Sequence, residues 1–158
     1  MSGTGYRVDV RRMDAFSAAE LHALLKLRVD VFVVEQKCPY NEIDGKDPDA
    51  LHLRLMEGDA LIAAARLFAP AGPSKPSRIG RVVVSPDHRG KRLGEALMRE
   101  AIGQCESLFP EHPIALSAQS HLERFYRSFG FTPVSEEYLE DDIPHVDMMR
   151  QMAGVPAP

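Results

Sequence analysis

Residues 82–97 limit most strongly how this chain can fold. They begin with three consecutive valines, a run that suits a strand covered on both faces of a sheet. Pro86 cannot donate to a strand ladder and therefore ends the strand. Apolar residues then recur at helical spacing from Leu93. The sequence thus predicts a buried strand that runs through a short basic turn with two glycines into an amphipathic helix.

A turn of this kind is suited to binding an anion. The unpaired N–H groups and the positive dipole end of the helix point at whatever lies before its N-terminus, and a pyrophosphate fits there. Arg89, Lys91 and Arg92 add positive side chains to the turn. The alternative is an ordinary strand-to-helix connection with solvated cations, and these residues alone do not separate the two interpretations.

The composition is typical of a globular protein. The chain has 158 residues, of which 44% are hydrophobic and 27% charged, and its formal net charge is −4. We therefore expect one domain over residues 1–158, with a loose tail at 153–158. An acidic chain without a basic tract does not favour nucleic acid as its main partner.

The same sequence predicts a cytoplasmic protein without a membrane partner. No apolar run approaches the roughly 20 residues that cross a bilayer, and the first residues lack the apolar segment of a signal peptide. Cys38 and Cys105 have no zinc or redox spacing, so both are expected as reduced thiols. The carboxylates of residues 39–49 do not match a calcium loop, and we expect no metal.

Hydrophobic periodicity predicts alternating strands and helices. Strands are expected at residues 6–11, 51–56, 61–68, 78–85, 113–118, 131–134 and 145–149. A first helix is expected to begin at a Ser17/Glu20 capping box, and a second to cover residues 93–109. A third is expected to run from a Ser120/Glu123 capping box to a glycine cap at Gly130. This order predicts an α/β fold, a mixed sheet with helices packed on it.

The segments between these elements are expected to be polar. Arg28 falls on the apolar stripe of the first helix, and we expect it to extend into solvent. Glu35 ends an apolar run, where a carboxylate could lie near a pocket lined by the core. Residues 39–49 and the acidic residues 136–142 are expected as loops.

The basic turn resembles the acyl-CoA loop of the GNAT superfamily of N-acetyltransferases. That motif is Arg/Gln-x-x-Gly-x-Gly/Ala, and this sequence has Arg89-Gly90-Lys91-Arg92-Leu93-Gly94, with Arg92 where glycine is usual. The run from Phe125 to Phe131 resembles the family's Phe-Tyr-x-x-x-Gly-Phe helix, and Gln119 stands where an asparagine usually precedes it. Residues 27–40, 43–47, 118–122 and 143–148 are similar to the ElaA-like subgroup. The resemblance covers about residues 17–150.

The resemblance implies a fold and a co-substrate. The fold is a central mixed, mostly antiparallel sheet flanked by helices, with acyl-CoA bound at a splayed strand pair. Acetyl-CoA is the co-substrate, the valine strand pairs its main chain with the pantetheine arm, and the turn anchors the pyrophosphate. The implied cofactor-binding residues are Val82, Val83, Val84, Arg89, Gly90, Lys91, Arg92, Leu93, Gly94, Glu95, Gln119, Phe125 and Tyr126.

The resemblance also implies catalytic roles. From the residues alone Tyr126 is better interpreted as a half-buried helix tyrosine, but it matches the family's general acid, which protonates the departing sulfur, and the resemblance favours that role. Glu35 and His145 stand equal as candidates for the general base. His121, or a water relay that needs no dedicated base, is the alternative.

Together these features predict a GNAT-type N-acetyltransferase. It would move the acetyl group of acetyl-CoA by direct transfer to a primary amine of a small molecule or to an exposed amino group. A non-catalytic acyl-CoA-binding sensor or scaffold is the alternative, as is a transferase with another acyl donor. The variable segments 39–49 and 136–145 are expected to form the amine pocket, and the family allows a homodimer.

Overall fold

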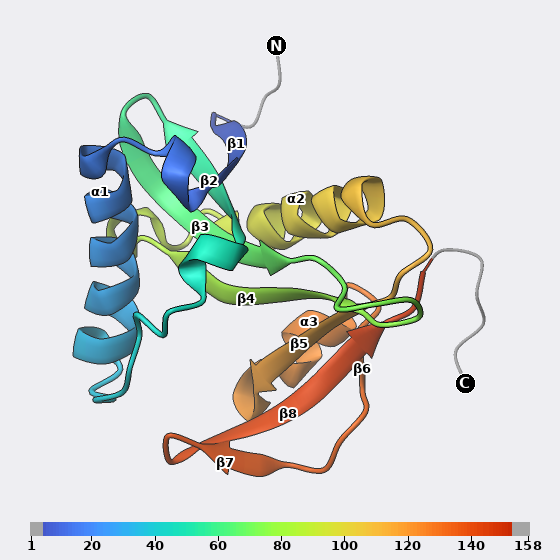
Figure 1. The fold of residues 1–158 in the computed structure, drawn as a ribbon. Helices are drawn as coiled ribbons and strands as arrows, with labels where there is room; N and C mark the ends of the chain where they lie inside the picture. Colours follow the sequence, from blue (N-terminus) through green and yellow to red (C-terminus); the bar gives the residue numbers. More distant parts are fainter. Residues whose placement is uncertain (1–4, 153–158) are drawn as a thin grey trace. The chain divides into compact units, whose positions relative to one another are not determined.

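The computed structural model describes residues 5–152, so the tail expected at 153–158 lies outside the described residues. The chain forms two compact units. The first consists of Met1–Leu67 and Arg81–Ala101, and the second of Phe68–Gly80 and Ile102–Pro158. Figure 1 shows the elements of both units, and each unit is described separately.

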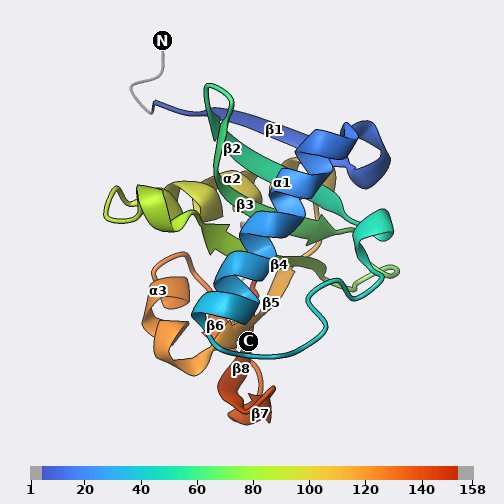
Figure 2. The same ribbon diagram turned by 90° about the vertical axis from the view of Figure 1, so that its left-hand side faces the viewer.

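The first unit is built on strands in the order β1-β2-β3-β4, in which β1 pairs with β2 and β2 with β3 in antiparallel fashion. Helix α1 lies along one face of β1, β2 and β3, and the N-terminal part of α2 lies on the other (Figures 1 and 2). The elements are β1 (Arg7–Arg12), α1 (Ala18–Val29), β2 (Leu51–Glu57), β3 (Ala60–Phe68), β4 (Ser77–Val84) and α2 (Leu93–Leu108). The last residues of β3, the first half of β4 and the end of α2 belong to the second unit.

Helix α1 begins as the sequence predicts. The Ser17 hydroxyl accepts from the Glu20 N–H at 3.1 Å, and the Glu20 carboxylate accepts from the Ser17 N–H at 2.9 Å, which completes the capping box. After Val29 the chain continues as a π-helical segment, Asp30–Glu35. π-Helical segments are rare in proteins, and many of those that do occur lie at functional sites.

The two faces of the first unit's sheet differ in chemistry. The register places Asp9 opposite Arg54 and Arg11 opposite His52, so charged residues share one face. On the other face lie buried aliphatic residues such as Leu53. The charged face is the one that α1 covers, because Glu20 of α1 bonds to both Arg11 and Arg54.

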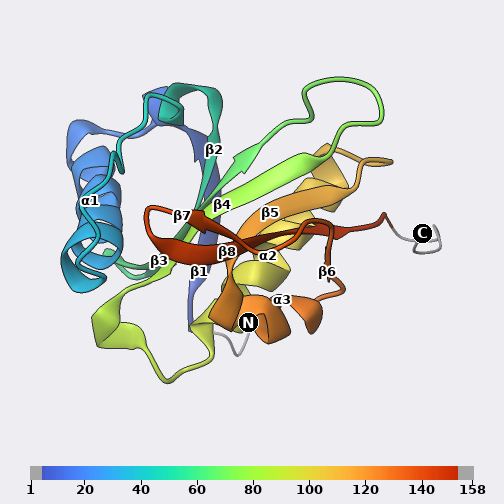
Figure 3. The ribbon, with the colours of Figure 1, turned by 90° about the horizontal axis from the view of Figure 1, so that it is seen from below.

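In the second unit the strands follow the order β4-β5-β8-β6, and β7 pairs with β8. Strand β4 is parallel to β5, with Ser77 opposite Ile114, and the other pairs are antiparallel. Figure 3 shows β7 beside β8 and α3 against β5 and β8. The elements are β5 (Ile114–Gln119), α3 (Glu123–Arg127), β6 (Thr132–Pro133), β7 (Tyr138–Glu140) and β8 (Ile143–Arg150). The predicted mixed, mostly antiparallel sheet is confirmed.

Two local predictions in the second unit are wrong. Ser120 does not cap a helix: it begins a 3-10 turn, Ser120–Leu122, its buried hydroxyl has no hydrogen-bond partner within the described part of the chain, and α3 begins only at Glu123. Part of the acidic loop expected at 136–142 forms β7, since pairing with β8 satisfies its backbone. Across residues 5–152, no helix is long and apolar enough to cross a membrane.

Candidate active site

The predicted anion-binding turn lies in the first unit, between β4 and α2. The N–H of Ser85 donates to the carbonyl of Ile62 at 2.8 Å, which ends β4 against β3. Gly90 and Arg92 then adopt left-handed backbone conformations, with φ of +83° and +57°, immediately before α2. A turn that mixes left- and right-handed residues before a helix presents a concave set of N–H groups, which is a site for an anion.

The backbone conformation of Arg92 explains why the acyl-CoA loop motif usually has glycine at this position. A left-handed residue with a Cβ is strained by roughly 1–2 kcal/mol, whereas glycine adopts the same φ freely. The Arg92 side chain is 86% exposed, with Glu95 3.7 Å away. The turn therefore keeps its left-handed backbone although arginine, and not glycine, occupies position 92.

Arg89 in this turn is paired with Glu35. The two side chains form a bidentate ion pair, with N–O distances of 2.7 and 2.9 Å. The hydrogen bond from Arg89 holds the pKa of Glu35 below its usual value, and the same bond raises the pKa of Arg89. The Glu35 side chain is 43% exposed, so the expectation of a core-lined surrounding is wrong. A carboxylate bound in this way is a weaker base than a free one.

The valine strand before the turn contributes to the core of the first unit. Val83 is buried and packs with Phe16, Leu24, Val31 and Ala64. Val82 and Val84 are partly buried. The side chains of this strand therefore serve packing, and its main chain is the part available for chemistry.

A buried charge cluster lies beneath α1 in the same unit. It combines the arginines Arg28, Arg66 and Arg81 with the carboxylates Glu42, Asp44 and Asp47. Arg28 is 1% exposed, so the expectation that it extends into solvent is wrong. Its Nε donates to Glu42 at 2.7 Å and its Nη1 to Asp47 at 2.8 Å.

The cluster perturbs its carboxylates strongly. Hydrogen bonds from Arg66 at 2.6 and 3.0 Å hold the pKa of Asp44 far below its usual value. Burial pushes the pKa of Asp47 upward, but the hydrogen bonds from Arg28 and Arg66 outweigh it and leave that pKa lowered. The sequence did not reveal this cluster, although the alternation Leu51-His52-Leu53-Arg54 was a signal that one face of β2 is polar, and His52 on that face lies opposite Arg66 of β3.

The predicted general acid lies on α3 in the second unit. Tyr126 is buried, and its ring meets those of Phe125 and Phe131 edge-on, at 5.1 and 6.3 Å between centroids. Burial raises the pKa of Tyr126 to about 12. The phenol is therefore protonated throughout the physiological range. Helix α3 ends where Gly130, at φ +92°, reverses the chain, as predicted.

His145 is held in a defined orientation on β8. Its Nδ1 lies 2.7 Å from the carbonyl of Ile143, which can only accept, so Nδ1 carries the proton and Nε2 of the neutral ring keeps its lone pair. Nε2 lies 3.5 Å from Glu140, and the ring stacks on Tyr138. Gln119 lies opposite His145 in the β5–β8 register. An imidazole arranged in this way is suited to accept a proton.

Polar side chains that the sequence did not single out continue along the same strands. The hydroxyls of Tyr138 and Ser117 both donate to Asp147, at 2.5 and 2.9 Å. Ser117 and Asp147 are opposite each other in the β5–β8 register. Of the other candidate base, His121, the structure shows only an exposed side chain in a 3-10 turn.

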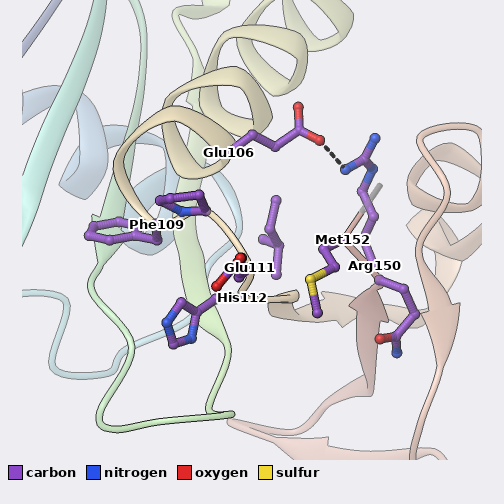
Figure 4. Close-up of a pocket in the computed structure, with 9 residues that line it drawn as sticks. Glu106, Phe109, Glu111, His112, Arg150 and Met152 are labelled. Carbon is purple, nitrogen blue, oxygen red and sulfur yellow. Dashed lines mark hydrogen bonds and ion pairs between the residues drawn. The ribbon is translucent and has the colours of Figure 1, made fainter. Parts of the chain in front are cut away.

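A pocket of about 230 Å³ lies elsewhere in the second unit (Figure 4). It is lined by the end of α2, the residues that follow it and the end of β8, where Glu106 and Arg150 form an ion pair at 2.9 Å. None of the predicted site residues lines it. Within residues 5–152, no group of three His, Cys, Asp or Glu side chains could hold a metal ion.

The fold agrees with the comparisons to known proteins. The family described as "Acetyltransferase (GNAT) domain" matches residues 18–152, and the chain belongs to this family. Protein ElaA of Escherichia coli is 46% identical over 138 residues, which are 86% of this chain and 90% of that protein. A UPF0039 protein of Schizosaccharomyces pombe is 40% identical over 141 residues, 88% of this chain and 93% of that protein.

Solved structures agree with this assignment. An acyl-CoA N-acyltransferase from Pseudomonas aeruginosa is 45% identical with a TM-score of 0.87, over 92% of this chain and 99% of that one. The crystal structure of E. coli ElaA gives 42% identity and a TM-score of 0.86 over the same shares. The resemblance to the GNAT family and its ElaA-like members is thereby confirmed.

Proposed function

We propose that this chain is an acetyl-CoA-dependent N-acetyltransferase that acts on a primary amine of a small molecule or on an exposed amino group. The observation that carries the proposal is the turn before α2, whose left-handed residues and helix N-terminus suit a pyrophosphate. Membership of the GNAT family supports acyl-CoA as the molecule that carries this pyrophosphate.

In this proposal the turn and the valine strand hold acetyl-CoA. The N–H groups of residues 89–95 bind the pyrophosphate, with Arg89 and Lys91 adding positive charge. Val82, Val83 and Val84 pair their main chain with the pantetheine arm. The N–H of Val83 or Val84 donates to the thioester oxygen, where negative charge develops during attack.

His145 and Tyr126 move the protons. The neutral amine attacks the thioester carbonyl, and the nitrogen gives up a proton to Nε2 of His145 as the C–N bond forms. The C–S bond then breaks, and Tyr126 protonates the leaving thiolate. We prefer His145 over Glu35 as the base because its Nδ1 donates to the Ile143 carbonyl, which leaves Nε2, 3.5 Å from the Glu140 carboxylate, to accept the proton. Glu35, by contrast, is bound to Arg89 and its pKa is lowered.

Release of free CoA across a panel of amines tests the reaction. The wild-type protein should turn over with at least one amine well above thioester hydrolysis. Tight binding of acetyl-CoA without turnover on any amine would instead support a sensor or scaffold, and faster turnover with a longer acyl chain would identify another donor.

The acid is tested by Tyr126→Phe. We expect kcat to fall by about 10²–10⁴-fold, the usual contribution of a positioned acid, with little change in CoA affinity. Tyr6→Phe, which removes a hydroxyl that donates to Glu100, is the matched control and should leave kcat unchanged. Equal kcat in the wild type and Tyr126→Phe would remove Tyr126 from this role.

A further inference from the structure

Arg81 adopts an unusual backbone conformation in β4, next to the valine strand segment that is proposed to bind acyl-CoA. It lies within β4, directly before the three valines, and its φ is +50°. Gly80 precedes it, yet the left-handed conformation falls on the arginine and not on the glycine. Because a left-handed residue with a Cβ is strained, something in the fold must hold Arg81 there.

The side chain of Arg81 is held by one short segment, residues 40–44. Its Nε donates to the Glu42 carboxylate at 2.8 Å, and its Nη2 donates to the Glu42 carbonyl at 3.2 Å and to Asp44 at 3.4 Å. The guanidinium also lies over the ring of Tyr40, 5.5 Å from its centroid, and the Tyr40 hydroxyl donates to Glu42. These contacts fix the guanidinium on several sides.

The anchors themselves are fixed by other elements. Glu42 is 3% exposed and accepts a second arginine bond, from Arg28 of α1. Asp44 accepts from Arg66 of β3 at 2.6 Å. Three arginines and three carboxylates balance in charge, so no member can move away without leaving a buried charge unpaired.

We propose that Arg81 is a positioning residue for acyl-CoA. Residues 40–44 hold the Arg81 side chain and thereby keep the Arg81 backbone in its left-handed conformation within β4. That conformation sets the direction of the N–H and C=O groups of Val82–Val84. The inference rests on the proposed function, in which those main-chain groups bind the pantetheine arm. It links a segment expected to line the amine pocket to the strand that holds the acyl donor.

Two substitutions separate the conformation of Arg81 from its charge. Arg81→Ala and Arg81→Gly remove the same contacts, but only glycine adopts φ +50° without strain. We expect acetyl-CoA to bind to Arg81→Ala about 5–30-fold more weakly than to Arg81→Gly, the equivalent of roughly 1–2 kcal/mol. Arg81→Gly should stay within a few-fold of the wild type. Isothermal titration well below the unfolding temperature measures all three affinities.

Arg78 provides the matched control in the same strand. Its side chain is exposed and its φ is not positive, so Arg78→Gly should bind acetyl-CoA no better than Arg78→Ala. Should Arg81→Ala fail to fold, Arg81→Asn and Arg81→Ser make the same comparison, because asparagine tolerates the left-handed region better than serine. The Arg81→Asn variant is then expected to bind acetyl-CoA more tightly than the Arg81→Ser variant.

Equal affinities of Arg81→Ala and Arg81→Gly would overturn the inference, whether both match the wild type or both are weak. In the first case the conformation is irrelevant to binding, and in the second only the lost charge matters. A wild-type protein that does not bind acetyl-CoA would overturn the proposed function itself, and the inference with it. The two failures are therefore distinguishable.

Discussion

Replacing Arg92 by glycine should make the protein more stable although it removes a whole side chain. The left-handed backbone of Arg92, at φ +57°, stores roughly 1–2 kcal/mol of strain that glycine does not have. Glycine in turn lowers the free energy of unfolding by roughly 0.5–1 kcal/mol, because the unfolded chain has more conformational freedom at a glycine. The exposed contact with Glu95 at 3.7 Å contributes at most about 0.5 kcal/mol.

These contributions combine to a change in the free energy of unfolding between about −0.5 and +1.5 kcal/mol for Arg92→Gly, centred on a stabilisation of about 0.5 kcal/mol. Arg92→Ala is the control, because alanine keeps the strained φ and loses the same side-chain contact. Glycine should therefore exceed alanine by about 0.5–1 kcal/mol, or about 1–4 °C in Tm. Urea titration and thermal melting of both variants measure the difference. If Arg92→Gly is no more stable than Arg92→Ala, the turn is not strained and the reasoning fails.

The same pair of variants tests how the turn binds its anion. If N–H groups hold the pyrophosphate, Arg92→Gly should keep its affinity for acetyl-CoA within a few-fold, since only an exposed and salt-screened charge is lost. A large loss in both variants would mean that the guanidinium itself binds the phosphates.

Four further predictions concern glycines and titrating groups. Gly130→Ala should lower the free energy of unfolding by about 1–2 kcal/mol, because φ there is +92°. Gly103→Ala, within α2 and with no atom beyond the neighbouring helix backbone within 4 Å of the added Cβ, should raise it by about 0.5–1 kcal/mol. Burial raises the pKa of Tyr126 to about 12, so its contribution to stability is intact below pH 10 and is lost between pH 10 and 12. Unfolding curves of Tyr126→Phe should lack that loss. Because Arg66 lowers the pKa of Asp44, stability should fall as the pH drops below about 4. Asp44→Asn should be less sensitive to acid, and an unchanged acid profile would contradict this assignment.

Local sequence signals predicted the elements that depend on neighbouring residues. The capping box at Ser17 and Glu20 is formed as predicted, because both partners lie within one turn of helix. The valine strand, the turn and the cap at Gly130 also follow from residues adjacent in sequence. The roles of Glu35, His145 and Tyr126 stay predictions, to be tested by the experiments above.

The errors arose where a distant element competes with a local signal. Ser120 and Glu123 have the spacing of a capping box, yet the chain leaves β5 in a 3-10 turn and the hydroxyl does not reach the helix amide. Arg28 occupies an apolar stripe, and its partners come from residues 14 and 19 positions further along the chain. Spacing within one helix cannot reveal such partners.

The buried cluster changes what substitutions in residues 39–49 should do. Asp47 accepts three hydrogen bonds from Arg28 and Arg66, at 2.8–3.1 Å, so Asp47→Asn leaves one positive charge of the buried cluster unbalanced and should cost about 3–5 kcal/mol of stability. Asp49→Asn, at an exposed position of the same segment, should cost less than about 0.5 kcal/mol. Urea titration of both separates a structural carboxylate from a solvated one, and equal stability would show that the cluster is not a stabilising unit.

A segment fixed in this way limits where amine specificity can be encoded. Substituting a carboxylate of the cluster should lower the free energy of unfolding, whatever the amine. Only side chains that the cluster leaves outside can vary without that penalty, and Ile43, 60% exposed, is one of them. In our proposal Ile43→Ala should therefore change the relative kcat/KM among amines while the urea midpoint stays the same. An unchanged ranking of amines would place their recognition outside this segment.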